Sequence, residues 1–207
     1  MRDQTVETWL EALASSAHAP AGGAAAALSA AIGAALIEMA CNLTIGRPRY
    51  AQHEAEMRAA LAEATTLRRR ALRLAADDVQ AFDAVAEAYK LPRETDAQRQ
   101  SRTEHIQRAL VGATEVPLKT AALAGDVIQL ARRIVDGTNV NVLADLAAGV
   151  VSARAALETA LIAVEANLAA INDPSRGKEL SERMTGVSAL AAEAERTVRD
   201  IRSKINR

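Results

Sequence analysis

The chain has 207 residues, half of them hydrophobic, and a formal net charge of −1. This length can bury a substantial core in one domain or in two small ones. The near-neutral charge gives no general electrostatic reason to expect nucleic acid or a membrane as a partner. Alanine dominates and aromatic residues make up only 2% of the chain, a composition that favours helices because alanine is the best helix former.

The N-terminal segment is predicted to form a helix that ends near Ser15, with Thr5 or Asp3 as its cap. Its apolar residues recur at helical spacing, namely Val6, Trp9, Leu10 and Leu13. The segment is charged and amphipathic and lacks the apolar core of a signal peptide. We therefore expect a cytoplasmic protein.

The stretch 24–41 is apolar on every side except at Ser29 and Glu38, a pattern typical of a buried helix. It is long enough to span a membrane, but it is mostly alanine and contains an acid, which disfavours insertion. We interpret it as the central helix of a soluble bundle. Cys41 is the only cysteine and cannot form an intramolecular disulfide, so it is predicted to be a buried structural thiol.

Residues 50–90 contain neither glycine nor proline and predict one helix about 60 Å long, unless it bends near Asp77. Pro92 follows its end, and Thr95 or Asp96 is expected to cap the next helix. The apolar stripe of the long helix consists of Met57, Leu61, Ala64, Leu67, Ala71, Leu74, Phe82, Val85 and Tyr89.

Pro117 is expected to interrupt the helix that follows, or to start a new one. Residues 136–138 are predicted to end this helix, and residues 139–141 to start the next one. A helix over about 142–171 is again apolar nearly all round, and a final helix over about 178–205 is expected to loosen at Gly186.

These elements predict a single all-α domain over residues 1–207, a multi-helical bundle with long antiparallel helices. Two helices that are apolar on every side are more than one layer of covering helices can bury. We therefore expect a homodimer, in which a second copy covers the remaining apolar surface.

Short blocks occur in a fixed order along the chain. They are PAGG at 20–23, CNLTIGRPRY at 41–50, DDVQAFD at 77–83, YKLP at 89–92 followed by Thr95, EVPL at 115–118, NVNVLAD at 139–145 and NL at 167–168. In this order and spacing the chain resembles the formiminotetrahydrofolate cyclodeaminase / methenyltetrahydrofolate cyclohydrolase family, in particular its stand-alone bacterial members.

The resemblance implies an all-helical, dimeric enzyme that acts on a tetrahydrofolate derivative, with no metal and no cofactor beyond the folate substrate. The leading activity is hydrolysis of methenyltetrahydrofolate to formyltetrahydrofolate. One alternative is formiminotetrahydrofolate cyclodeamination, which releases ammonia. A second, of another class, is a non-catalytic folate-binding or scaffold homodimer. The chain has alanine at four positions where the family pattern has another residue, Ala21, Ala144, Ala147 and Ala163, and Ala144 and Ala147 favour this non-catalytic alternative.

Asp145 is the candidate catalytic residue, because both reactions need a carboxylate that handles a proton and faces a delocalised positive charge. It lies four residues after Asn141, so the two share a face at the start of a helix. The helix N-terminus favours its ionised form, whereas the apolar neighbours Leu143 and Leu146 oppose it. The alternative role is a first-turn Asp on a solvated helix end.

Two further pairs of residues are candidate substrate-binding groups. Gly22 and Gly23 would present backbone N–H groups at a helix start to a pterin oxygen or a carboxylate. Asn139 and Asn141 would hydrogen-bond the pterin or a water molecule. The alternative for each pair is plain helix capping.

The segment from Asn42 to Tyr50 completes the predicted binding site. Arg47, Arg49 and Tyr50 are expected to bind the glutamate tail or the pteridine, because arginine suits bidentate pairing with a carboxylate. The alternative is that these charges complement the C-terminus of the buried helix.

The remaining ionisable residues are assigned structural roles. Asp77, Asp78 and Asp83 are expected to form exposed ion pairs with the arginines of their helix, and the alternative is that they supply a second carboxylate. The three histidines lie far apart without the spacing of metal ligands, which argues against a metal site.

Overall fold

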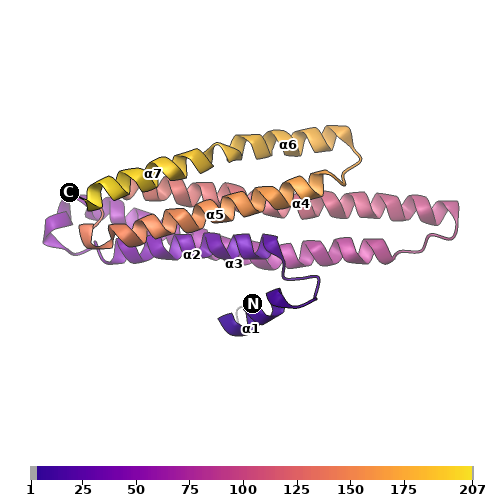
Figure 1. Ribbon diagram of the computed structural model, residues 1–207, viewed down its shortest axis with the longest axis horizontal. Coiled ribbons are helices and arrows are strands. Elements are labelled where there is room, and N and C mark those ends of the chain that lie inside the picture. The colour runs from indigo at the N-terminus through magenta and orange to yellow at the C-terminus, as the bar shows by residue number, and fades with distance from the viewer. Residues whose placement is uncertain (1–3, 207) are drawn as a thin grey trace.

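The computed structural model describes residues 4–206, and this part of the chain is helical with no strand (Figure 1). The α-helices are α1 (Val6–Ala14), α2 (Gly22–Asn42), α3 (Glu54–Lys90), α4 (Asp96–Ile134), α5 (Leu143–Leu168), α6 (Pro174–Ser188) and α7 (Leu190–Ile205), and two short 3₁₀ helices, η1 (Pro48–His53) and η2 (Val140–Val142), precede α3 and α5. The all-α class is confirmed.

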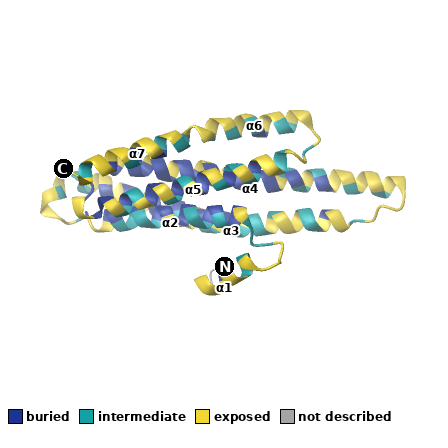
Figure 2. Cartoon of the chain, viewed as in Figure 1, coloured by how far each residue is buried: buried dark blue, intermediate teal, exposed yellow. Residues whose placement is uncertain are grey.

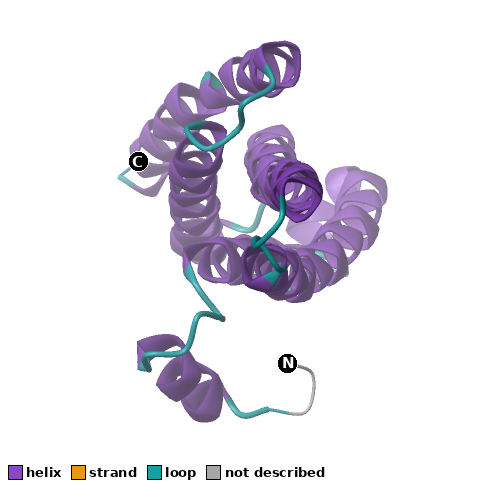
Figure 3. Ribbon diagram, turned by 90° about the vertical axis from the view of Figure 1, so that its right-hand side faces the viewer, coloured by secondary structure: helices purple, strands orange, loops and turns teal. Residues whose placement is uncertain are grey.

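The four long helices α2 to α5 form the body of the molecule. In Figure 1 the chain runs leftward along α2, returns along α3 to the far right, comes back along α4 and returns again along α5. α2 packs on α3 and α5, and α4 packs on the same two helices. α6 and α7 lie along α4 and α5, while α1 lies outside the bundle (Figure 3) and contributes Trp9 to the hydrophobic core. α3 and α4 extend beyond the ends of α2 and α5.

The packing of α2 against α5 depends on two glycines. A Cβ atom on Gly33 would lie 2.8 Å from the backbone oxygen of Gly149, and a Cβ on Gly149 would lie 3.0 Å from that of Gly33. The two backbones therefore approach each other at a point where neither helix can carry a side chain. This close crossing explains why most of the buried residues of α2 are alanine or glycine.

Local capping signals determine several of the helix ends, as predicted. Thr5 caps α1 by accepting a hydrogen bond from the backbone N–H of Thr8, whereas Asp3, the other expected cap, lies outside the described residues. Thr95 forms a capping box with Gln98 at the start of α4.

The prediction that Pro117 breaks a helix is wrong, because α4 continues through it from Asp96 to Ile134. The final helix was also wrongly delimited. α6 already begins at Pro174, where Asp173 accepts hydrogen bonds from the first backbone N–H groups, and the interruption before α7 lies at Ala189 rather than at Gly186.

From Met57 to Leu74 the predicted apolar stripe of α3 is buried apart from the half-buried Leu61, and none of its residues beyond Leu74 is buried. Phe82 and Tyr89 are 41% and 51% exposed. Figure 2 shows the burial of α3 decreasing toward its C-terminal end, where α2 no longer accompanies it. The same long helix has no break near Asp77 and begins at Glu54, after the 3₁₀ turn η1.

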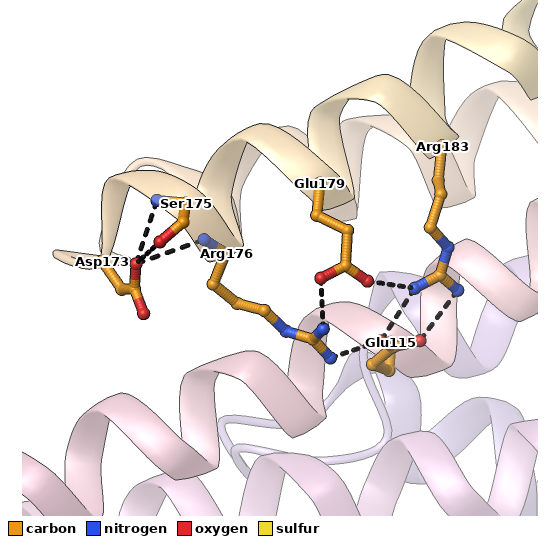
Figure 4. A network of polar contacts seen from close by, with 6 residues as sticks. All are labelled: Glu115, Asp173, Ser175, Arg176, Glu179 and Arg183. Atoms are coloured by element: carbon orange, nitrogen blue, oxygen red, sulfur yellow. Dashed lines mark hydrogen bonds and ion pairs between the residues drawn. The ribbon is translucent and has the colours of Figure 1, made fainter.

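A carboxylate on α4 holds α6 against the body of the molecule (Figure 4). Glu115 accepts two hydrogen bonds from Arg183, at 2.8 and 2.9 Å, and one from Arg176 at 3.0 Å. The hydrogen bonds from Arg183 lower the pKa of Glu115 below its ordinary value. The pair of guanidinium groups thus links the outer helix to α4 with charge-assisted hydrogen bonds.

Two segments are long and apolar enough to cross a membrane by length and composition alone, α2 and residues 140–168. The core helix of a soluble protein meets the same criterion, and α2 is packed by α3, α4 and α5. Glu38 within α2 is paired with Arg68 and accepts a hydrogen bond from Thr65. Because other helices cover α2 and its one acidic side chain is paired with an arginine, we interpret α2 as a core helix.

The close crossing of α2 and α5 is testable with two glycine-to-alanine substitutions. Gly33→Ala is expected to lower stability by about 1–3 kcal/mol, because the new Cβ meets backbone that can only move with its helix. Gly112→Ala is the matched control, since it lies within exposed helix with no atom near the new Cβ, and alanine there should stabilise by about 0.5–1 kcal/mol. Denaturant unfolding measures both, and equal effects would contradict the crossing.

Candidate active site

One pocket lies at the N-terminal end of α2, with a volume of about 290 Å³. We call it the glycine pocket, and its walls come from four helices. They include Gly22 and Gly23 of α2, Asp78 and Phe82 of α3, Pro117 of α4 and Asn167 of α5. A pocket between the helices of a bundle is a common place for a small-molecule site.

Gly23 is required where it stands because the carboxyl group of Asp78 occupies the adjacent space. A Cβ on Gly23 would overlap that carboxylate, with its Cγ only 2.6 Å away. Burial raises the pKa of Asp78 above its ordinary value, and the backbone N–H of Ala24 partly offsets this. Asp78 is therefore not the exposed ion-pairing residue that was predicted, because it lies half-buried at the start of α2.

Pro117 and Asn167 form another wall of this pocket, and one hydrogen bond explains why the two residues occur together. Proline has no N–H, so Pro117 leaves the carbonyl of Ala113 without its helical donor. The side-chain amide of Asn167, from α5, donates to that carbonyl at 3.0 Å. α4 can therefore continue through a proline, and α5 is fixed to α4 beside the pocket.

A second pocket of about 220 Å³ lies at the other end of α2, where the chain passes through η1 and η2. We call it the arginine pocket, and its lining includes Arg47, Arg49, Tyr50, Asn139 and Asn141. Neither arginine forms an ion pair with a described residue. The structure thus brings together five of the predicted binding residues at a site with uncompensated positive charge.

The arginine pocket is held in shape by Asn139, which is 6% exposed. Its amide donates to the carbonyl of Leu43 at 2.9 Å, and its side-chain oxygen accepts from the backbone N–H of Asn141 at 3.1 Å. Tyr50 accepts a hydrogen bond from the backbone N–H of Val140. Asn139 therefore caps η2 and joins the loop after α2 to the loop before α5, which is the structural alternative given for it. Arg47 is exposed.

The predicted site residues do not all meet within one chain. α2 has 21 residues and so separates the two pockets by about 30 Å. Gly22 and Gly23 lie at one end, whereas Asn42 and Asp145 lie near the other, Asn42 as the last residue of α2 and Asp145 in the first turn of α5. Neither Asn42 nor Asp145 lines the two pockets, and Asp145 is half-buried.

Asp78 could have been recognised from the sequence. It lies four residues after Leu74 and four before Phe82, directly on the apolar stripe of α3. A carboxylate on the buried face of a helix is unusual unless it is paired or functional. The neighbouring Asp77 and Asp83 lie off that stripe and are exposed.

The cysteine and the histidines do not contribute to either pocket. Burial raises the pKa of the Cys41 thiol to about 11, so it is protonated and inert at neutral pH, as expected of a structural thiol. His18 stacks beside Phe82, and His53 packs against Gly137. Within residues 4–206 no three His, Cys, Asp or Glu residues are placed to hold a metal ion.

Comparison with known proteins establishes the family of the chain. Residues 5–186 match the family described as formiminotransferase-cyclodeaminase. The chain belongs to this family. It is 42% identical to a methenyltetrahydrofolate cyclohydrolase of Methylorubrum extorquens over 205 residues, which is 99% of each chain.

The chain is also similar to two further proteins. It is 30% identical over 166 residues to rat formimidoyltransferase-cyclodeaminase, an alignment that covers 80% of this chain but 30% of that protein. The crystal structure of formiminotetrahydrofolate cyclodeaminase from Thermotoga maritima has the same fold, with a TM-score of 0.86, 22% identity and coverage of 97% and 96% of the two chains. Two of the four departures from the family pattern, Ala21 and Ala163, line the glycine pocket.

The role of Asn167 is testable by a double-mutant cycle. Asn167→Ala is expected to destabilise by about 1–3 kcal/mol, because it leaves the buried carbonyl of Ala113 without a donor. Pro117→Ala restores the helical N–H, so Asn167→Ala should cost less in that background. Denaturant unfolding of the two single variants and the double variant measures the coupling. Strictly additive losses would show that the two side chains act independently.

Proposed function

We propose that this chain is a methenyltetrahydrofolate cyclohydrolase. The observation that carries the proposal is its 42% identity, across 99% of both chains, with a protein of that name. In this reaction water attacks the carbon that bridges two nitrogens of the folate, and the cationic ring opens to a formyl group. The step needs a proton acceptor and a group that faces positive charge, but no metal and no cofactor beyond the folate.

We assign the chemistry to Asp145 and the binding of the substrate to both pockets. Asp145 lies in the first turn of α5, one turn after Asn141 of the arginine pocket. Arg47 and Arg49 suit the carboxylates of the glutamate tail, because guanidinium groups pair with carboxylates through two hydrogen bonds. The backbone at Gly22 and Gly23 supplies the other end of the site.

A homodimer reconciles these assignments with the separation of the pockets. The apolar helices α2 and α5 both run between the glycine pocket and the arginine pocket. They expose large apolar side chains, among them Ile32 at 49%, Val151 at 52% and Ile162 at 65%. A second copy that packs on this surface about a two-fold axis would bury them, as in isologous dimers generally.

We place this two-fold axis perpendicular to the helices, so that it reverses one copy relative to the other. The N-terminal end of α2 in one copy then lies near the C-terminal end of α2 in its partner, so the glycine pocket of one faces the arginine pocket of the other. One folate can reach both pockets only in this arrangement, since α2 alone is longer than a folate monoglutamate. Each dimer has two such composite sites.

We also propose that residues 1–207 form one domain of long antiparallel helices that works in the cytoplasm. A large hydrophobic cluster supports the single domain, because it joins Trp9 of α1 to Ile201 of α7 and includes residues of every long helix between them. The family match over residues 5–186 covers most of the same stretch.

The activity is tested by the loss of methenyltetrahydrofolate absorbance. Wild-type protein should hydrolyse the substrate well above the spontaneous rate, and Asp145→Asn should lower turnover by about 10²-fold or more while the fold persists, because a positioned proton acceptor is lost. Asp200→Asn, an exposed carboxylate on α7, is the matched control and should leave the rate unchanged.

The same experiment separates the alternatives. Ammonia release from formiminotetrahydrofolate that exceeds hydrolysis would make the protein a cyclodeaminase. Folate binding without turnover, unaffected by Asp145→Asn, would make it a non-catalytic homodimer. A wild-type rate for Asp145→Asn would remove that residue from the mechanism.

The composite site is tested by mixing two inactive chains. Asp145→Asn disables one end of the site, and Gly23→Ala disables the other by displacing the carboxylate of Asp78. Random pairing makes half of the dimers mixed, each with one intact site, so a refolded mixture should recover about a quarter of wild-type activity. Sedimentation establishes the dimer itself. A mixture as inactive as its components would show that each chain contains its own complete site.

A further inference from the structure

The carboxylate of Asp78 has no cationic partner. Asp78 forms no ion pair with any residue in the described part of the chain, although apolar surroundings have removed much of its side chain from water. Burying a carboxylate without a counter-charge destabilises a fold. A group that is kept at such a cost, in a pocket, is a candidate for ligand binding.

Capping of α2 does not by itself require a carboxylate from another helix. The residue at the N-cap position is Ala21, which provides no side-chain hydrogen bond. A serine or threonine there would cap the helix locally, without burying a charge from another helix. Asp78 instead approaches α2 from α3 and interacts with the backbone N–H of Ala24, in space left free by Gly23.

The other walls of the glycine pocket suit a flat heteroaromatic ring. Phe82, Pro117 and Ile162 contribute apolar surface, and Thr159 adds a hydroxyl group. The volume of about 290 Å³ accommodates a fused two-ring system rather than a whole folate. An apolar slot with one carboxylate is the arrangement expected for an aromatic ligand that has hydrogen-bond donors along one edge.

We propose that the glycine pocket binds the pterin ring of the folate and that Asp78 pairs with its 2-amino and N3–H groups. These two donors lie side by side on one edge of the ring, and a carboxylate matches them with two parallel hydrogen bonds, as it matches a guanidinium. The bridging carbon lies at the opposite side of the ring system, so Asp78 binds and orients the substrate while another group acts on the carbon. This inference rests on the proposed function.

The binding role is tested with Asp78→Asn and its neighbour Asp77→Asn. Calorimetry measures the Kd for tetrahydrofolate, which is not turned over, and steady-state kinetics gives kcat and KM for methenyltetrahydrofolate. Asp78→Asn should raise both Kd and KM at least about tenfold, because its amide puts a donor against the donors of the pterin, and kcat should change less. Asp77→Asn alters an exposed carboxylate and should change neither constant.

A ligand analogue tests the same pairing without any substitution in the protein. A tetrahydrofolate with a methyl group in place of the 2-amino group has lost one of the two donors. Wild-type protein should bind it at least about tenfold more weakly than tetrahydrofolate, and Asp78→Asn should discriminate much less between the two ligands. Equal affinity of the wild-type protein for both would overturn the proposal whether or not the variant folds.

The melting temperature separates a binding defect from a folding defect. Because burial raises the pKa of Asp78, the folded state favours its neutral form, and ionisation at pH 7 lowers stability. Asp78→Asn is neutral at every pH and should melt no lower than the wild-type protein at pH 7. Any advantage should shrink as the pH falls below the ordinary pKa of an aspartate, where both side chains are neutral.

The outcomes are distinct from those of the cyclohydrolase test. A fall in kcat with unchanged Kd would show that Asp78 acts at the reacting carbon and overturn its binding role. Unchanged constants for Asp78→Asn would overturn the inference and leave the proposed activity standing. If the wild-type protein does not hydrolyse methenyltetrahydrofolate, the proposed function fails. The Kd values for Asp78→Asn and for the 2-methyl analogue still decide whether Asp78 binds the 2-amino and N3–H groups of the pterin.

Discussion

The close approach of α2 to α5 at Gly33 and Gly149 is the constraint on which the rest of the structure depends. Two backbones in direct contact leave no freedom to slide or rotate, because any shift brings a larger neighbour into the crossing. The crossing lies at the middle of α2 and in the first third of α5. It therefore fixes both ends of the pair at once, and each end forms one of the pockets.

At each end of the pair, polar groups from distant parts of the chain form hydrogen bonds that shape the pocket beside α2 and α5. Asp78 reaches the start of α2 from α3, and Asn167 on α5 supplies the hydrogen bond that Pro117 removes from α4. At the other end, Asn139 joins the loop after α2 to the loop before α5. These polar contacts are few, so each one has a large effect on the shape of its pocket.

The sequence predicted those features that depend on residues close together in the chain. The capping box at Thr95, the burial of α2 and the all-α class follow from local propensity and hydrophobic pattern. The continuation of α4 through Pro117 could not be predicted, because the side chain that donates to the free carbonyl of Ala113 belongs to Asn167, 54 positions further along the chain. The place of Asp78 on the apolar stripe of α3 is visible in the sequence, but only the packing of α2 on α3 shows that its carboxylate lies beside the start of α2.

In the proposed function, the charges left unpaired in a single chain match the two ends of a folate. The glycine pocket has a carboxylate without a cation, and the pterin edge offers N–H donors. The arginine pocket has guanidinium groups without an anion, and the glutamate tail offers carboxylates. In one chain these complementary ends are about 30 Å apart, at opposite ends of α2. In the homodimer that we propose, association through the apolar face between them joins each end to its counterpart in the other copy, so the surface that drives dimer formation is also the surface that assembles the site.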